Sequence, residues 1–278
     1  MRIPTSVLTQ SRIAISRALS STNQNCHQSP DSFTRSMSSS TKLPAAHPPE
    51  HQIKSERPPL ISCLNPLTES APCSPHAIAN RSRQLSTAEL SELNKAISTG
   101  HKQLNKAIAG LKESNAKHLE RMKVFFGPNT DPRGIEAGLK LIKARLTSIK
   151  TARNYYLDPI DTPNPVIAFT FVPVSISMPM EPKIFVRKKL FEMRRGKQAN
   201  ILIHEAAHSS LLVTDVKLDD GKSAYGIIKS IGLGLNCPKS AVQNADNWAL
   251  FANSFGYDGH VEDAINYQKA TSKNAPVA

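Results

Sequence analysis

Aromatic residues and cysteines are both scarce in this sequence, and it contains no long apolar run. Only 5% of the 278 residues are aromatic. The four cysteines, Cys26, Cys63, Cys73 and Cys237, form no C-x-x-C pair. They do not predict a disulfide framework and give no argument for an oxidising compartment. No run reaches the ~18–20 apolar residues of a membrane-spanning helix, so we expect no membrane partner.

Residues 1–80 lack hydrophobic periodicity, and acidic residues are absent before Asp31. This region holds ten of the 20 prolines, with many serines in its first half. Because such a composition cannot form a core, we expect residues 1–80 to be a disordered leader. The first residues are rich in arginine and serine and have no continuous apolar stretch, which excludes a secretory signal. Their composition is equally typical of a type III secretion leader and of a mitochondrial transit peptide.

The net charge of +13 is unevenly distributed. Residues 81–160 carry 15 Lys and Arg against 7 Asp and Glu, whereas residues 161–278 carry 13 against 11. These basic residues alternate with glutamates in helical patterns and are not accompanied by aromatic residues that could stack on bases. The pattern favours a solvated helix surface, so we expect no nucleic-acid partner, and a basic helical binding module is the alternative.

Residues 81–278 are predicted to form one domain, helical over residues 81–156. "STAELSEL" from Ser86 is a capping-box pattern that starts a helix. The helix is expected to restart through "KHLERMKVFFG". A further helix carries a regularly spaced apolar stripe that marks its buried face. The stripe consists of Ile135, Leu139, Ile142, Leu146 and Ile149.

Residues 157–270 are predicted to combine a sheet, a central helix and a C-terminal helix. "NPVIAFTFVPVSISMPM" is rich in Val, Ile and Phe but interrupted by prolines, which indicates short strands with at least one at a sheet edge. "KIFVRKKLFEM" predicts a further strand or a turn of helix. The run from Lys197 to Val213 contains no proline or glycine and favours a helix. The fold class is therefore α+β, mainly helical with a small edge-stranded sheet.

Three ionisable residues interrupt this last, otherwise apolar helix. His204 and His208 are four residues apart, so they share one helix face and can reach the same cation. Glu205 lies beside them, and "HEAAH" matches the zinc-peptidase pattern H-E-x-x-H. The pattern arises by chance in about 1% of chains of this length, but the apolar flanks are typical of a buried active-site helix. Tetrahedral zinc then needs a third protein ligand and an open position for water.

The residues after the helix indicate a family. Leu211 and Thr214 stand where metzincins carry glycine and histidine. The following "VTDVKLDDGKSAYG" and the later "AVQNADNWALFANSF" instead resemble the aspzincins, the deuterolysin and peptidyl-Lys metallopeptidase group. "FFG" at 125–127 resembles the upstream segment of that family. The resemblance covers roughly residues 85–257 and implies a zincin-like metallopeptidase domain.

The resemblance implies a role for each site residue. His204, His208 and Asp215 would bind Zn²⁺, and Glu205 would activate the zinc-bound water and pass its proton to the leaving amine. Tyr225 would stabilise the oxyanion, or else it is a packed core tyrosine. The spacing between Asp215 and Tyr225 is longer than the family's. The alternative carboxylate ligands are Asp219 and Asp220.

Asp246 is either the acceptor for the free N–H of a ligand histidine or a plain capping residue. Other residues are expected to be structural. Trp248 and Phe251 are assigned to the core, and His101, His118 and His260 to the surface.

The resulting functional prediction is a monomeric zinc-dependent endopeptidase that acts on protein or peptide substrates. A catalytically inactive zinc-binding scaffold is the alternative, which the intact Glu205 disfavours. The disulfides of secreted fungal relatives have no counterpart here. The leader is therefore assigned to type III secretion of an effector into a host cell, with a mitochondrial location as the alternative.

Overall fold

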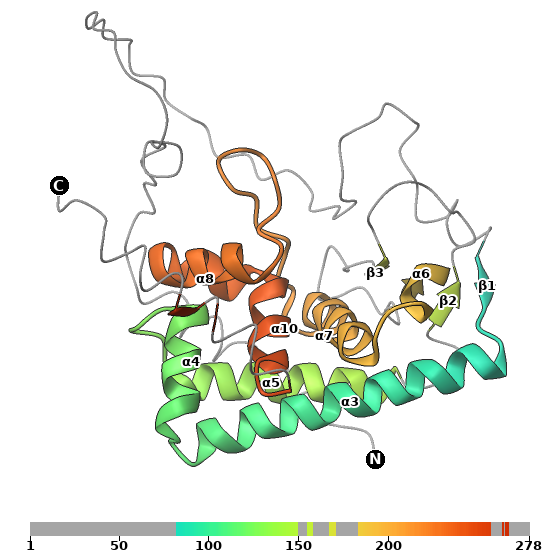
Figure 1. The fold of residues 1–278 in the computed structure, drawn as a ribbon, viewed down its shortest axis with the longest axis horizontal. Coiled ribbons are helices and arrows are strands. Elements are labelled where there is room, and N and C mark those ends of the chain that lie inside the picture. Colours follow the sequence, from blue (N-terminus) through green and yellow to red (C-terminus); the bar gives the residue numbers. More distant parts are fainter. Residues whose placement is uncertain are drawn as a thin grey trace, which may run out of the picture.

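The computed structural model describes residues 82–149, 155–157, 167–170, 183–256, 263, 265 and 266, and these form a mainly helical fold with one small sheet (Figure 1). The expectation for residues 1–80 and that for His260 lie outside these residues. Among the described residues, no helix is both long and apolar enough to cross a membrane. The elements in chain order are β1 (Arg83–Gln84), α3 (Thr87–Lys112), α4 (Ala116–Phe126), α5 (Pro132–Ser148), β2 (Tyr155–Leu157), β3 (Ala168–Thr170), β4 (Ile184–Val186), α6 (Lys188–Phe191), α7 (Arg195–Leu211), α8 (Ile227–Asn236), α9 (Pro238–Gln243) and α10 (Ala245–Asn253).

Helices α3, α4 and α5 begin at residues that satisfy free backbone N–H groups. The predicted capping box is present: the Ser86 hydroxyl accepts from the Glu89 N–H, and the Glu89 carboxylate accepts from the Ser86 N–H. Asn115 caps α4, which ends at Gly127. Asp131 caps α5 ahead of a proline in the first turn. Local sequence therefore determines where these three helices begin.

The sheet has four strands in the order β1-β2-β4-β3. β2 and β4 are parallel, and both outer strands, β1 and β3, pair antiparallel to their neighbours. The predicted edge strand is β3, which pairs Phe169 with Phe185 of β4. The sequence predicted either a strand or a turn of helix for residues 183–193. The structure has both, because β4 is followed directly by α6. Strand β1 was not anticipated, because two residues carry no periodicity.

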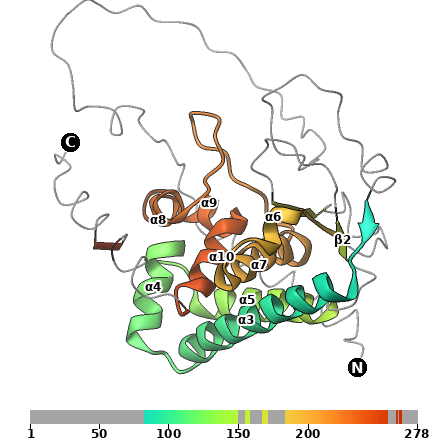
Figure 2. The same cartoon turned by 45° about the vertical axis from the view of Figure 1, so that its right-hand side comes forward.

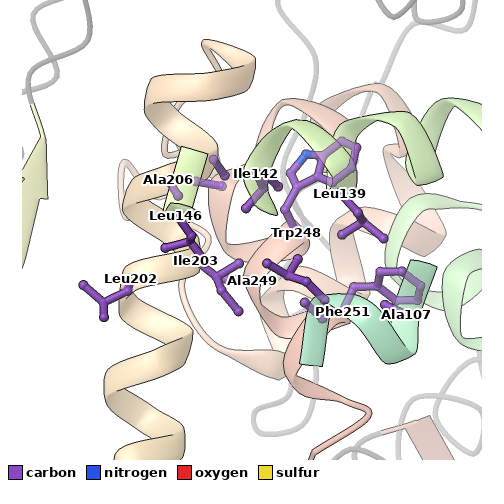
Figure 3. Close-up of a cluster of buried hydrophobic side chains, with 14 of the residues drawn as sticks. Ala107, Leu139, Ile142, Leu146, Leu202, Ile203, Ala206, Trp248, Ala249 and Phe251 are labelled. Carbon is purple, nitrogen blue, oxygen red and sulfur yellow. The ribbon is translucent and has the colours of Figure 1, made fainter. Parts of the chain in front are cut away.

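Helix α7 lies at the centre of the fold and packs against α3, α5 and α10 (Figures 1 and 2). The predicted stripe of α5 is buried over its whole length. Figure 3 shows Leu139 and Ile142 of α5 close to Trp248 of α10, with Ile203 of α7 on the other side of the same cluster. Trp248 and Phe251 are both buried, which confirms their assignment to the core.

Two expectations need correction. The central helix begins at Arg195 rather than Lys197, so Gly196 lies inside its first turn. His118 is not a free surface residue, because its ring is partly buried and stacks on Phe255 with 4.3 Å between ring centroids. His101 is partly exposed and lies near the Thr147 hydroxyl.

Candidate metal centre

The second half of α7 places three ionisable side chains inside the protein. His204, Glu205 and His208 are all buried. Their neighbours on the helix, including Ala206 and Ala207, are also buried, because α3, α5 and α10 cover this part of α7. Buried ionisable groups are costly unless they have partners, so the surroundings of these side chains have to supply them.

A tight turn brings a carboxylate back to the two histidines. Helix α7 is followed by its C-cap residue Leu212, which has a left-handed conformation with φ of 57°. The chain then reverses, and Asp215 Oδ1 lies 3.1 Å from His204 Nε2 and 3.4 Å from His208 Nε2. The two Nε2 atoms are 3.0 Å apart. Three potential ligand atoms from two segments therefore converge on one point.

The outer nitrogens of both imidazoles have other partners. His204 Nδ1 lies 3.1 Å from Asp246 Oδ1, and His208 Nδ1 lies 2.8 Å from the Val213 carbonyl oxygen. A carbonyl and a carboxylate both accept, so we assign the proton of each imidazole to Nδ1. With a metal bound, each Nε2 would present a lone pair toward the common point, which is the tautomer that metal-binding histidines need.

This set of atoms fits a zinc ion. Bond lengths of about 2.0–2.1 Å in a tetrahedral zinc site place neighbouring ligand atoms about 3.3 Å apart, close to the observed separations. Asp215 Oδ1 is also buried without a hydrogen-bond partner among the described residues, although His204 Nε2 is near it. Two lone pairs and a carboxylate oxygen would repel one another, and a cation between them removes that repulsion. Within the described residues, His204, His208 and Asp215 form the group that could hold a metal ion.

The electrostatics of this site favour positive charge at the point where the three atoms converge. Burial alone would lower the pKa of His204, but the carboxylates of Asp215 and Asp246 raise that pKa well above its ordinary value. Burial would raise the pKa of Asp215, and the two neighbouring imidazoles more than offset this and lower it. Both shifts show that the site stabilises a cation next to an ionised carboxylate.

Glu205 has a different environment from Asp215. Burial raises the pKa of its carboxyl group, while the two histidines and a hydrogen bond with the backbone of Thr170 in β3 partly oppose that increase. A carboxylate with a raised pKa is a stronger base than an exposed one. The edge strand of the sheet thus lies directly beside the glutamate of the motif.

Tyr225 lies beside His204 and is partly accessible to solvent. Its ring centroid is 5.9 Å from that of His204, and 45% of its surface is exposed. Burial of the hydroxyl group and the nearby Asp215 carboxylate raise the pKa of Tyr225, so the phenol stays protonated and able to donate. The interpretation of Tyr225 as a packed core residue is therefore wrong.

Asp219 and Asp220 lie away from the three converging atoms. Both are exposed in the turn of a hairpin between α7 and α8, where Asp220 Oδ1 accepts from the Lys222 N–H. Asp246, by contrast, is buried, and its Oδ2 accepts from the Gly226 N–H at 2.6 Å. It therefore links His204 to the residue after Tyr225. The Val213 carbonyl was missed, because a backbone acceptor leaves no signal in the sequence.

This arrangement defines a buried metallopeptidase-type centre: two histidines and a nearby carboxylate around one point, with a glutamate beside them. The sequence model of the aspzincin family, described as lysine-specific metallo-endopeptidase, matches residues 111–253, more than half of the chain. The chain therefore belongs to the aspzincin family and is a zinc metalloendopeptidase.

A solved structure of a zinc peptidase from Grifola frondosa is similar to this chain with 20% sequence identity and a TM-score of 0.44. The similarity covers 61% of this chain and 97% of the other. Curated protein sequences yielded no match.

Proposed function

We propose that His204, His208 and Asp215 hold the zinc ion of this endopeptidase and that Glu205 is its general base. The convergence of His204 Nε2, His208 Nε2 and Asp215 Oδ1 on one buried point is the observation that carries this proposal. Zinc bound there would act as a Lewis acid and favour attack of water on the peptide carbonyl.

Glu205 and Tyr225 divide the proton transfers and the charge stabilisation between them. The Glu205 carboxylate takes a proton from the attacking water and delivers it to the nitrogen of the leaving amine. The protonated Tyr225 hydroxyl donates to the oxygen that becomes negative when the carbonyl is attacked. The Asp246 carboxylate accepts a hydrogen bond from His204 Nδ1 and so holds that imidazole in the required orientation.

Glu205→Gln tests this assignment, since it preserves the shape of the side chain but removes the base. Cleavage of casein should fall by about 10²–10⁴-fold, the usual contribution of a general base, while zinc content stays at one per chain. Glu113→Gln, an exposed change at the end of α3, is the matched control and should cleave at the wild-type rate. Wild-type cleavage by Glu205→Gln would refute the role of this glutamate.

The substrate preference and the biological setting are further proposals. The family description names lysine, so peptides containing lysine are the first substrates to assay. Delivery as a type III effector rests on the composition of residues 1–80 alone, with their many serines and late first acidic residue. A host protein is the corresponding substrate class.

A further inference from the structure

A regular hairpin separates two residues of the site. Residues 216–224 run from Asp215 to Tyr225 and project above the helices (Figures 1 and 2). Lys217 pairs with Ser223, and Leu218 N–H donates to the Lys222 carbonyl at 2.9 Å. Gly221 closes the tip with φ of 73°, a conformation that glycine adopts without strain. The hairpin is thus an ordered excursion inserted between two side chains that must stay close together.

The two stems of this hairpin meet one buried amide. The side chain of Asn244 is fully buried. Its Oδ1 accepts from the Val216 N–H at 3.1 Å, and its Nδ2 donates to the Ala224 carbonyl at 3.2 Å. Val216 and Ala224 also bond to each other through the Ala224 N–H, at 2.8 Å. The amide therefore fastens the residue after Asp215 and the residue before Tyr225 at a single point.

The Asn244 side chain holds the two stems and does not make the hydrogen bond that is usual at its position. It is the N-cap residue of α10, where an asparagine side chain normally accepts from the first turn, but it makes no such bond. Its second N–H donates instead to Asn247 Oδ1 at 2.7 Å. Asn247 is itself held by the carbonyls of Phe125 and Ser230. These contacts fix the orientation of the amide and connect it to α4 and α8.

We propose that Asn244 is a positioning residue that holds Asp215 and Tyr225 in catalytic register independently of the hairpin between them. The inference rests on the proposed roles of those two residues. A connection of this length would leave its ends free to separate, and closing it at the base removes most of that freedom. Its Oδ1 acts on the Asp215 side and its Nδ2 acts on the Tyr225 side, so the two can be perturbed separately.

Asn244→Asp tests the Tyr225 side. At alkaline pH the introduced carboxylate still accepts from the Val216 N–H but presents an oxygen to the Ala224 carbonyl. We expect zinc content to stay at one per chain and KM for a quenched fluorescent lysine peptide to stay within about twofold. We expect kcat to fall about a hundredfold, the usual effect of misplacing a catalytic group by about 1 Å. Lowering the pH should restore kcat in part, because a protonated carboxyl can donate to that carbonyl.

A double-mutant cycle shows whether Asn244 acts through Tyr225. Tyr225→Phe combined with Asn244→Asp should be no slower than Tyr225→Phe alone, because the second change displaces a hydroxyl that is already absent. Independent, multiplying losses would overturn the proposal. If Tyr225→Phe keeps the wild-type kcat, the proposed role of Tyr225 fails. Asn244→Ala then tests whether Asn244 holds the two stems of the hairpin. That variant removes both side-chain hydrogen bonds to the stems and should weaken zinc binding about 10–100-fold, and unchanged zinc binding would refute the proposed role of Asn244.

Gly221→Ala is the matched control in the same hairpin. An added Cβ there meets no atom within 4 Å, so only the conformation of the tip is strained. Because Asn244 holds the stems, both kcat and zinc content should remain at wild-type values. If Gly221→Ala lowers kcat as strongly as Asn244→Asp, the conformation of the tip affects the site, and the proposed role of Asn244 is wrong.

Discussion

His204 and His208 each donate a hydrogen bond from the Nδ1 N–H to a partner outside helix α7. The Val213 carbonyl follows His208 by one turn of chain, whereas Asp246 comes from α10, far along the sequence. Two independent contacts therefore orient the imidazoles before any metal arrives, and this lowers the entropic cost of binding. These two hydrogen bonds explain why the three ligand atoms already converge.

At the same scale, the choice of carboxylate can be tested with three variants. Asp215→Ala removes the oxygen that lies 3.1 Å from His204 Nε2, so it should lose zinc on dialysis and cleave nothing measurable. Asp219→Ala and Asp220→Ala change exposed residues of the hairpin tip and should keep one zinc per chain. Zinc content measured by mass spectrometry decides. Retention by Asp215→Ala, with loss in either of the others, would reverse the assignment.

The sequence predicted some site residues far better than others. His204 and His208 were predictable because i and i+4 positions share a helix face, and Asp215 because it follows a helix end by one turn. Asn244 was not predictable as a clamp. Its hydrogen bonds join segments 20 and 28 residues away, and an asparagine before a helix indicates only a cap.

Among the elements, α5 and α10 show how closely the helices behind the site approach. Gly138 of α5 lies against the Trp248 ring, and a Cβ built there would come within 2.5 Å of two ring atoms. Trp248 is fully enclosed and its indole N–H donates to the Val242 carbonyl, so the ring cannot move aside easily. The absence of a side chain at position 138 therefore sets the distance between these helices.

Gly138→Ala should consequently destabilise the protein, although alanine favours helix. Overpacking costs about 1–3 kcal/mol, which exceeds the ~1 kcal/mol gained in helix propensity. Gly232→Ala in α8 is the matched control, because a Cβ there meets nothing within 4 Å. That control should be more stable than the wild type in urea unfolding. Equal stability gains in both variants would contradict the described packing.

The elements themselves were unequally predictable. The stripe of α5 and the capping box of α3 repeat over many residues, so their signals add up. The strands contain two or three residues each, and their order β1-β2-β4-β3 depends on pairing between distant segments. Sequence periodicity could indicate that strands exist but could not determine which strands are neighbours.

For the whole molecule, a central α7 means that the fold and the site share one core. The same helix that carries the histidines contributes Leu202 and Ile203 to the main hydrophobic cluster, so the motif cannot shift without disturbing that cluster (Figure 3). Catalytic geometry and global stability are thus coupled through one helix.

The predicted leader should be dispensable for this core. A chain shortened to begin at Arg81 should keep its melting temperature and its zinc-dependent cleavage, because residues 1–80 lack a core-forming pattern. Size-exclusion chromatography of the same chain should show the expected monomer. A lower melting temperature would contradict the assignment of residues 1–80 as a separate leader.

The purpose of that leader can be tested separately. Residues 1–80 fused to a translocation reporter should carry it through a type III system into host cells. The composition that predicts this is the serine-rich, arginine-containing start without acidic residues before Asp31. Recovery of a mature chain cut within this region from mitochondria would favour the transit-peptide alternative.

Anomalous diffraction at the zinc absorption edge, on crystals of the zinc-loaded protein, tests the central claim most directly. We expect one peak per chain, in contact with Nε2 of His204, Nε2 of His208 and a carboxylate oxygen of Asp215. A peak bound by other residues, or none at these three in a protein that cleaves peptides, would contradict it.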